Sequence, residues 1–395
     1  MSATEPEIYL DAAATTPPLP AVIEAIQNVQ AHAWANPSSL HGSGLQAAEA
    51  LERARASIAL ALGAQCSELI VTSGATESVH LALLGSAAMQ SPGRLVISAV
   101  EHPCVPAAAE RLRQLGWEIA IWPVNHQGLI QLDQLDRLLA PPTRLVSLIW
   151  GQSEVGALQP VISVARACRS LGIRFHTDAT QLIPQGRICW RDLPIDLLTL
   201  SAHKLQGPKG VGLLLRRVEH SLVPLQGGGG QQQDLRSGTE PVDLIAGLAV
   251  ALNVLPKFDA LADEVPPGAS ATIQDRRNLL LDQLLHLPGI SSLGPSVNQR
   301  LPHHISLALS SKEGQPMSGR AVVRQLARVG IAASSGSACS SGRSTDSPIL
   351  TAMGLESSRR QSGLRFTLGP WLSNDQLQVV PERLSRAMRA VDCKA

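Results

Sequence analysis

The sequence has few charged and few aromatic residues. Of 395 residues only 16% are charged, and 33 basic residues against 32 acidic ones leave a formal net charge of +1. The aromatic residues are 3 Phe, 6 Trp and 1 Tyr. A chain without a basic surface lacks the attraction that nucleic-acid backbones and anionic membranes require, and so few rings offer little surface for base stacking. These absences argue against a nucleic-acid-binding protein.

The sequence also lacks a long hydrophobic run and a recognisable targeting segment. Its longest strongly apolar stretch, residues 244–255, is interrupted by Gly247 and Asn253. This stretch is shorter than the roughly 18 to 20 residues that a membrane span requires. The first eight residues have neither a basic region nor an apolar one, unlike a secretory or transit peptide. We therefore expect a cytoplasmic protein that does not cross a membrane.

Cysteines are few and widely spaced, and no two of them form a Cys-x-x-Cys pair. This spacing argues against a structural zinc site and against a disulfide framework, so no metal is expected. A cysteine with a special role would be a reactive thiol. Cys339 suits that role because it lies among Gly and Ser residues with no apolar pattern to bury it, whereas Cys168 lies in a helix-like stretch typical of a buried cysteine.

Short apolar runs alternate with helix-like stretches over about residues 68–215. This alternation predicts an α/β fold with a mostly parallel sheet that helices cover. The predicted strands are residues 68–72, 94–98, 144–150, 172–177 and 195–200.

A smaller α+β domain is predicted beyond this region. An Ala/Leu-rich stretch between residues 249 and 267 is expected to be helical and to end at a boundary marked by two prolines and a glycine. The Gly-rich residues 226–234 are expected to form a flexible surface loop. The other predicted elements are helices at residues 45–61, 276–285 and 319–329 and a strand at residues 304–309.

In open α/β sheets, ligands bind beyond the carboxyl ends of the strands. Residues 73–77 (Ser-Gly-Ala-Thr-Glu) follow one predicted strand. Small residues at the start of a helix suit a phosphate, although an ordinary helix cap has the same pattern. Asp178 follows another strand, where a buried carboxylate requires a cationic partner unless it caps a turn.

Two further strand ends carry a lysine and a histidine. Lys204 follows the strand at residues 195–200 and would form an imine if desolvated, or it is a solvated loop lysine. His102 suits stacking on a planar cofactor or proton transfer, or it is a hydrogen-bonded loop histidine. All four features map to the same sheet edge. Pyridoxal phosphate requires this set: a phosphate cup, a lysine for its aldehyde, a carboxylate for its ring nitrogen and a flat neighbour for its ring.

A series of short motifs runs in order along the chain. They begin at Tyr9 (Tyr-Leu-Asp-Ala-Ala-Ala-Thr-Thr), Asn36 (Asn-Pro-Ser-Ser-Leu-His), Thr72 (Thr-Ser-Gly-Ala-Thr-Glu), Glu101 (Glu-His-Pro), His176 (His-Thr-Asp-Ala-Thr-Gln), Ser201 (Ser-Ala-His-Lys), Gly207 (Gly-Pro-Lys-Gly), Gly228 (Gly-Gly-Gly-Gln), Arg236 (Arg-Ser-Gly-Thr) and Ser334 (Ser-Ser-Gly-Ser-Ala-Cys-Ser-Ser). The order of these motifs resembles that of the cysteine desulfurases, which are pyridoxal-phosphate enzymes of the class V aminotransferase fold, and in particular the group with a long catalytic-cysteine loop. The resemblance runs from about residue 8 to residue 369.

The resemblance implies a fold of the aspartate-aminotransferase type (fold type I). A large cofactor-binding domain would comprise residues 16–260. A small domain, made of residues 1–15 and 261–395, would carry the catalytic-cysteine loop. The resemblance also implies a homodimer.

The resemblance further implies a role for individual residues. Lys204 would bind the cofactor covalently, Cys339 would accept the substrate's sulfur, and His102 would stack on the ring and move a proton at the substrate thiol. Arg365 would hold the substrate carboxylate as a bidentate fork, and Asn36 would also bind substrate. The other implied cofactor contacts are Asp178 at the ring nitrogen, Gln181 at the phenolic oxygen, Ala75, Thr76, Ser201 and His203 at the phosphate, Ser153, and Thr239 at the phosphate in the neighbouring subunit.

Two segments depart from the family pattern. Gln152 and Ser153 stand where the family usually has two asparagines, and a serine is too short to contact both the cofactor and the substrate carboxylate. Gln232, Gln233 and Asp234 stand where the family tends to have Glu, a basic residue and Gly. These departures predict altered substrate affinity and an altered loop geometry.

We therefore expect the chain to convert L-cysteine to L-alanine and to retain the sulfur as a persulfide on Cys339. A sulfur-acceptor protein in iron–sulfur cluster or other sulfur-cofactor biosynthesis would then receive it, and a flexible loop suits a thiol that must visit both places. Two alternatives remain. One is a pyridoxal-phosphate-dependent cysteine, cystine or selenocysteine lyase that needs no enzyme thiol, and the other is a non-catalytic dimeric paralogue.

Overall fold

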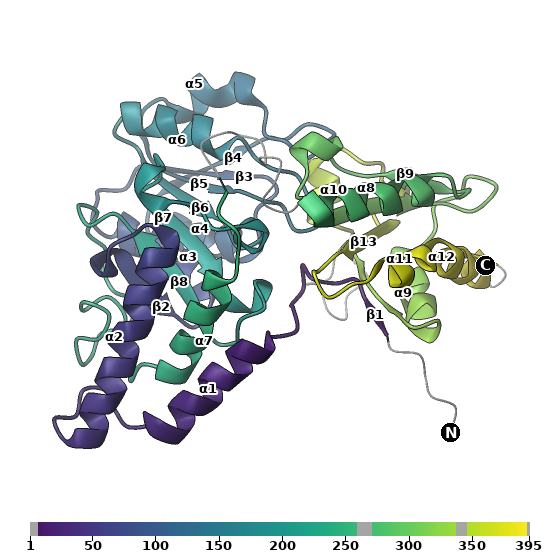
Figure 1. Cartoon of the computed structure of the whole chain (residues 1–395). Helices are drawn as coiled ribbons and strands as arrows, with labels where there is room; N and C mark the ends of the chain where they lie inside the picture. The colour runs from purple at the N-terminus through teal and green to yellow at the C-terminus, as the bar shows by residue number, and fades with distance from the viewer. Residues whose placement is uncertain (1–6, 259–270, 337–345, 393–395) are drawn as a thin grey trace.

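The computed structural model describes residues 7–258, 271–336 and 346–392, which form two lobes (Figure 1). The larger lobe contains a seven-stranded sheet in the order β2-β8-β7-β6-β5-β3-β4. All its neighbouring strands are parallel except β8, which runs antiparallel to β2 and β7. The strands are β2 (Leu69–Thr72), β3 (Arg94–Ser98), β4 (Glu118–Trp122), β5 (Thr143–Ile149), β6 (Arg174–Asp178), β7 (Leu197–Ser201) and β8 (Gly212–Arg216). The predicted α/β fold with a mostly parallel sheet is confirmed.

Helices cover both faces of this sheet, which explains why consecutive residues in its strands are apolar. In β3, for example, Val96 packs into one core, and Leu95 and Ile97 pack into the other. The core that contains Val96 includes residues of α1 (Pro20–His32), α2 (Gly42–Leu62), α6 (Val161–Ser170) and α7 (Val242–Asn253), and the opposite face packs on α3 (Ala75–Ala87) and α4 (Cys104–Gln114). A short helix, α5 (Leu135–Leu139), precedes β5.

The smaller lobe contains a four-stranded antiparallel sheet in the order β12-β13-β10-β9. Its strands are β9 (Ile290–Ser292), β10 (His304–Leu309), β12 (Ser334–Ser335) and β13 (Gly363–Thr367). Its helices are α8 (Ala271–Leu285), α9 (Gly319–Arg328), α10 (Pro348–Ala352), α11 (Asn374–Gln378) and α12 (Val380–Asp392). Within the three described ranges, no helix is both long enough and apolar enough to traverse a lipid bilayer.

The N-terminal segment belongs to the smaller lobe, although the rest of that lobe comes from the C-terminal part of the chain. Strand β1 (Ile8–Tyr9) pairs in parallel with β11 (Ile331–Ala332). Ile8 is buried in the same apolar core as Phe366. Figure 1 shows β1 in the smaller lobe and α1 in the larger one, so the residues between β1 and α1 pass from one lobe to the other.

One predicted helix lies earlier in the chain than the sequence pattern indicated. The stretch at residues 249–267 was expected to be helical, whereas α7 ends at Asn253 and residues 254–258 are not helical. Pro256 explains the difference, because proline lacks a backbone N–H and disfavours the helical conformation of the residue before it. Residues 259–267 of the predicted helix lie outside the described ranges.

Candidate active site

A cavity of about 620 Å³ lies at the edge of the seven-stranded sheet where the parallel strands end. Side chains that follow different parallel strands converge at such an edge. The predicted site residues that line this cavity are Ala75, Thr76, His102, Ser153, Asp178, Gln181, Ser201, His203, Lys204 and Arg365. The structure therefore brings these side chains together, and all but Arg365 come from the larger lobe.

Two of the predicted site residues within the described ranges do not line this cavity. Asn36 and Thr239 are exposed on the surface of the chain. Asn36 Oδ1 accepts a hydrogen bond from the backbone N–H of Ser38, 2.9 Å away, which forms a local turn. Cys339 lies outside the described residues. Its role, like the roles of the other two residues, stays a prediction.

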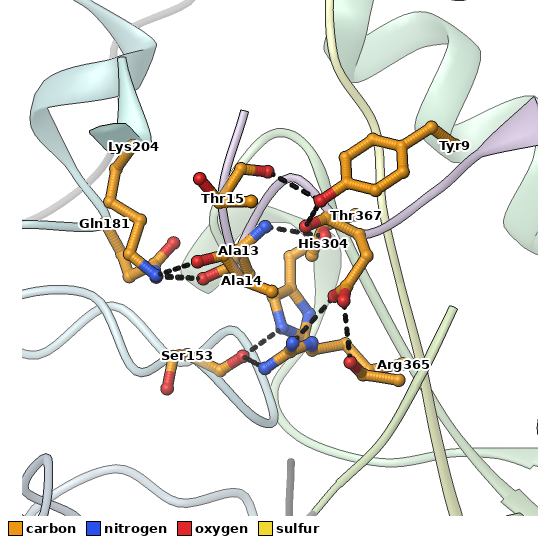
Figure 2. A network of polar contacts seen from close by, with 12 residues as sticks. Tyr9, Ala13, Ala14, Thr15, Ser153, Gln181, Lys204, His304, Arg365 and Thr367 are labelled. Atoms are coloured by element: carbon orange, nitrogen blue, oxygen red, sulfur yellow. Dashed lines mark hydrogen bonds and ion pairs between the residues drawn. The ribbon is translucent and has the colours of Figure 1, made fainter. Parts of the chain in front are cut away.

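The amine of Lys204 is held against the segment that connects the two lobes (Figure 2). Its Nζ donates hydrogen bonds to the backbone oxygens of Ala13 (2.5 Å) and Ala14 (2.7 Å). The same segment is tied to the residue before the lysine, because the Thr16 hydroxyl donates to the backbone oxygen of His203 (2.8 Å). The lysine amine is thus fixed at the cavity wall by a segment that follows β1.

Two carboxyl groups lie at this edge in different surroundings. Asp178, at the end of β6, lines the cavity and accepts a hydrogen bond from the backbone N–H of Thr180 (3.0 Å). Glu101 is buried behind the lining and accepts from the Ser98 hydroxyl (2.6 Å) and from Ile149 N–H (2.9 Å). Burial raises the pKa of Glu101 to about 8, those two bonds oppose the rise, and the charge of Asp178 adds to it. Asp178 is the carboxyl group that faces the cavity, and Glu101 is mostly protonated at neutral pH.

This assignment predicts a pH-dependent stability. Because the pKa of folded Glu101 is raised from 4.5 to about 8, the folded chain holds a proton that the unfolded chain loses as the pH rises through this window. The free energy of unfolding should therefore fall by up to about 1.4 kcal/mol for each pH unit in the window. Urea titrations of the parent and of Glu101→Gln, in one cofactor state and at one protein concentration, measure this effect. The free energy of unfolding of the variant should rise relative to that of the parent as the pH increases.

The exposed Glu24 of α1 provides the control for this experiment. Glu24→Gln removes a carboxyl that water already solvates, so its stability should follow that of the parent across the same pH range. A stability difference between Glu101→Gln and the parent that does not change with pH would contradict the assignment.

His102 has a thiol as its immediate neighbour. Cys104 Sγ lies 3.0 Å from His102 Nδ1, and the backbone N–H of Cys104 donates to the same nitrogen (3.3 Å). Burial raises the pKa of the Cys104 thiol, so it keeps its proton. Burial also lowers the pKa of His102, with the charge of Asp178 opposing and that of Lys204 contributing. Nδ1 is thus the acceptor of a neutral ring, and Nε2 carries the proton.

One side of the cavity is suited to bind an anion. The N-terminus of α3 begins at Ala75, where free backbone N–H groups and the helix dipole favour negative charge. Gly74 and Gly212 approach so closely that a Cβ on Gly212 would lie 2.6 Å from the Gly74 Cα. Ser201, His203 and Lys209 line the same cavity. A phosphate group fits these donors.

The guanidinium of Arg365 joins the two lobes at the cavity (Figure 2). It donates from Nη2 to the carboxylate of Asp11 (2.8 Å) and from Nη1 to the backbone oxygen of Ser153 (3.0 Å). His304 Nε2 lies 3.0 Å from the same Ser153 oxygen. Arg365 Nε has no partner among the described residues. A substrate carboxylate would therefore meet an arginine that Asp11 already orients.

The Gly-rich segment differs from the surface loop expected from its composition. The side chain of Gln232 is buried, and its Oε1 accepts hydrogen bonds from Arg55 Nη1 (2.7 Å) and from the backbone N–H of Val71 in β2 (2.9 Å). Gln232, Gln233 and Asp234 have φ angles of 49°, 60° and 64°, in the left-handed region that favours glycine. The expectation of a flexible surface loop was therefore wrong for Gln232, because tertiary contacts bury its amide.

Comparisons with known proteins agree over nearly the whole chain. The profile of the aminotransferase class-V family matches residues 8–380. Cysteine desulfurase IscS of Dictyoglomus turgidum is 34% identical over 391 residues, which cover 98% of this chain and 96% of that protein. A solved NifS-like protein has a TM-score of 0.85 at 27% identity, covering 98% of this chain and 100% of its own. The structure of SspA in complex with cysteine has a TM-score of 0.78 at 32% identity, covering 93% of this chain and 100% of that chain.

Proposed function

The chain belongs to the class-V aminotransferases and, within them, to the cysteine desulfurases, and from this premise we propose that it converts L-cysteine to L-alanine and retains the sulfur as a persulfide on Cys339. The observation that carries the proposal is the single cavity onto which an amine, a carboxylate, an imidazole and a guanidinium converge. They belong to Lys204, Asp178, His102 and Arg365. The family relationship supplies the reaction, and the cavity supplies side chains of the required chemistry.

The enzymes of this family depend on pyridoxal phosphate, and the described residues fit that cofactor. The anion-binding donors at the start of α3 suit its phosphate, Lys204 is the amine for its aldehyde, and Asp178 is the acceptor for its ring nitrogen. His102 would stack on its ring, Gln181 would bond its phenolic oxygen, and Ser153 would contact it at the cavity wall. When bound, pyridoxal phosphate draws electrons from the Cα of an amino acid and so makes a proton at that carbon acidic.

The residues of the chain would bind and orient the substrate. Arg365 would hold the L-cysteine carboxylate, and the held carboxylate would place Cα within reach of the Lys204 amine. That amine takes the Cα proton. The His102 ring, with its proton on Nε2, delivers or accepts a proton at the substrate sulfur. Because Asp178, Gln181 and Arg365 are buried, the cavity excludes most water from this chemistry.

The sulfur-transfer step balances without an external oxidant. The thiolate of Cys339 attacks the substrate sulfur, so an S–S bond forms while the Cβ–S bond of the substrate breaks. The electron pair of the broken bond stays with Cβ, which takes up a proton and becomes the methyl group of alanine. The products are L-alanine and a persulfide on Cys339, and reduction of the carbon matches oxidation of the sulfur.

The proposal extends to the fate of the sulfur and to the location of the protein. A sulfur-acceptor protein would take the persulfide sulfur for iron–sulfur cluster assembly or for another sulfur-containing cofactor. The cytoplasm is the proposed compartment.

We also propose a large domain of residues 16–260 and a small domain of residues 1–15 with 261–395. The two separate sheets and the burial of Ile8 in the core of the smaller lobe support this division.

Turnover of L-cysteine by the purified, cofactor-loaded protein tests the proposal. We expect equimolar alanine and sulfur, with the first equivalent of sulfur on the chain. Alkylation, digestion and mass spectrometry should locate the persulfide on the peptide that contains Cys339. If neither alanine nor a persulfide forms, or if the persulfide is on another cysteine, the proposal is wrong.

A homodimer is part of the proposed function. Trp34, Leu40 and Leu45, between α1 and the first turn of α2, are apolar yet 73%, 90% and 56% exposed in the single chain. Such a patch is typical of a surface that a partner covers. Asn36 lies within the patch, and neither it nor Thr239 lines the cavity of its own chain. A second copy of the chain is therefore the proposed occupant of this surface.

Leu40→Asp is expected to shift the protein from dimer to monomer. The side chain is almost fully exposed in the single chain, so the substitution should not unfold the protomer, whereas a buried aspartate at an interface costs several kcal/mol. Sedimentation velocity measures the change. Leu171→Asp, at an exposed apolar position after α6, is the control and should leave the dimer intact. A Leu40→Asp protein that remains dimeric would exclude this surface as the interface.

A further inference from the structure

Beyond the cavity itself, one buried carboxyl group contacts both ends of the segment that contains Cys339. Glu154 follows β5 and is buried. Its Oε1 accepts a hydrogen bond from the hydroxyl of Ser347, 2.5 Å away. The same oxygen lies so close to Gly336 that a Cβ on that glycine would be 2.4 Å from it. Residues 337–345 connect Gly336 to Asp346, so the described residues on both sides of that segment meet at Glu154.

Each end is also held by the rest of the fold. On one side, β12 (Ser334–Ser335) pairs with β13, and the backbone N–H of Gly336 donates to the oxygen of Gly363 (3.3 Å). On the other side, Ser347 caps α10, because its Oγ accepts from the backbone N–H of Leu350 (3.1 Å). Leu350 is buried in the core of the larger lobe. Glu154 thus connects a strand end of the smaller lobe to a helix packed on the larger one.

The position next to Glu154 holds the substrate-binding arginine. The backbone oxygen of Ser153 accepts from Arg365 Nη1 (3.0 Å), and Arg365 itself lies on β13. Ser153 therefore contacts Arg365, and the next residue, Glu154, contacts the described residues at both ends of the Cys339 segment. Cys339 is three residues beyond Gly336, which limits the Cα–Cα separation to about 11 Å. The position of Gly336 therefore sets the centre of the region that the thiol can reach.

The surroundings of Glu154 favour a carboxyl group that is partly protonated near neutral pH. Burial raises its pKa to about 7, and the bond from Ser347 and the charge of Arg365 oppose that rise. The carboxylate of Asp11 also lies near Arg365 and pairs with it. Further along the chain, Asp346 pairs with Arg360 (3.3 Å). A partly protonated carboxyl binds the Ser347 hydroxyl at a lower desolvation cost than a full charge would.

We propose that Glu154 is a positioning residue that sets the two ends of the Cys339 segment relative to Arg365, and thereby the placement of the acceptor thiol at the substrate sulfur. The inference rests on the proposed function, because it assigns to Cys339 the role of sulfur acceptor. It concerns the sulfur-transfer step and leaves substrate binding to Arg365. Position 336 requires a glycine, because any side chain there would collide with the carboxyl group of Glu154.

The test compares Glu154→Ala with Glu154→Gln in the cofactor-loaded enzyme. Glu154→Ala should slow formation of the Cys339 persulfide by about 10- to 100-fold, the usual effect of a misplacement of about 1 Å, and should leave the KM for L-cysteine nearly unchanged. Glu154→Gln retains an oxygen that accepts from Ser347 and should restore most of the rate. Single-turnover mass spectrometry of the Cys339 peptide measures persulfide formation, and the absorbance change on adding L-cysteine measures binding.

A second pair of variants keeps the proposal testable if Glu154→Ala does not fold. Ser347→Ala removes both the bond to Glu154 and a helix cap. Ser373→Ala removes a helix cap with no contact to Glu154, because Ser373 caps α11 by accepting from the N–H of Gln376. Slower persulfide formation in Ser347→Ala than in Ser373→Ala is expected. Equal rates in these two, or a parent-like rate in Glu154→Ala, would overturn the inference. A parent enzyme that makes no persulfide would instead refute the proposed function.

Discussion

Replacing Lys204 by alanine is expected to abolish conversion of L-cysteine, with a loss of about 10⁴-fold or more. The variant removes a side chain to which we assign two tasks, bonding to the cofactor aldehyde and taking the Cα proton. The lysine amine is held by the oxygens of Ala13 and Ala14 in the segment between the lobes. A nearby cation cannot replace it, because both tasks require an amine at that position.

The measurement for Lys204→Ala has two parts. Alanine formation reports turnover, and borohydride reduction followed by peptide mapping reports the covalent link, which should be found on Lys204 in the parent and be absent from the variant. Lys209→Ala is the matched control, since Lys209 is a second lysine that lines the same cavity. This control should bind cofactor more weakly and recover activity with excess cofactor. A Lys204→Ala enzyme with substantial turnover would contradict the proposed mechanism.

Replacing Cys339 by alanine is expected to eliminate the enzyme-bound persulfide entirely. L-Cysteine should still bind through Arg365 and produce the absorbance change that accompanies binding, because the substitution leaves the cavity residues in place. Alanine formation should fall by about 10²-fold or more, since breaking the Cβ–S bond then lacks its thiolate acceptor. The loss would thus appear at sulfur transfer and not at substrate binding.

Two other cysteines provide controls for the Cys339 experiment. Cys189 is exposed and Cys66 is partly exposed in the structure, so each thiol is open to adventitious sulfur. Cys66→Ala and Cys189→Ala should retain the activity of the parent. If Cys339→Ala releases sulfide at the parent rate in the presence of a reducing thiol, the enzyme does not use a persulfide. A lyase, the first of the two alternatives, would then explain the data.

Much of the cavity was predictable from sequence because its residues follow strands with strong local patterns. Asp178 ends β6, Lys204 follows β7, and His102 follows β3 by a few residues. Each strand is a short apolar run that both faces of the sheet bury, and parallel strands present their carboxyl ends at one edge. A local pattern therefore implied a common location. The edge strand β4 was not predicted, because most of its residues are only partly buried or exposed.

The contacts that orient these residues were not predictable in the same way. Arg365 is paired with Asp11, which is 354 positions away in the sequence. Glu154 and Ser347 are 193 positions apart, and Arg55 and Gln232 are 177 apart. No periodicity connects such positions, because they meet only when the chain has folded. The raised pKa values of Glu101 and Glu154 have the same origin, since burial depends on what covers a residue and not on its neighbours in the chain.

The amino-acid sequence by itself determined the α/β architecture, the edge of the sheet at which the chemistry occurs, and the resemblance to a family. These properties depend on hydrophobic periodicity and on short motifs, which are local. Only the tertiary structure decided which groups hold Arg365, which carboxyl stays uncharged, and which residue meets both ends of the Cys339 segment. These properties depend on distances between segments remote in sequence and on the exclusion of water, and both arise from packing.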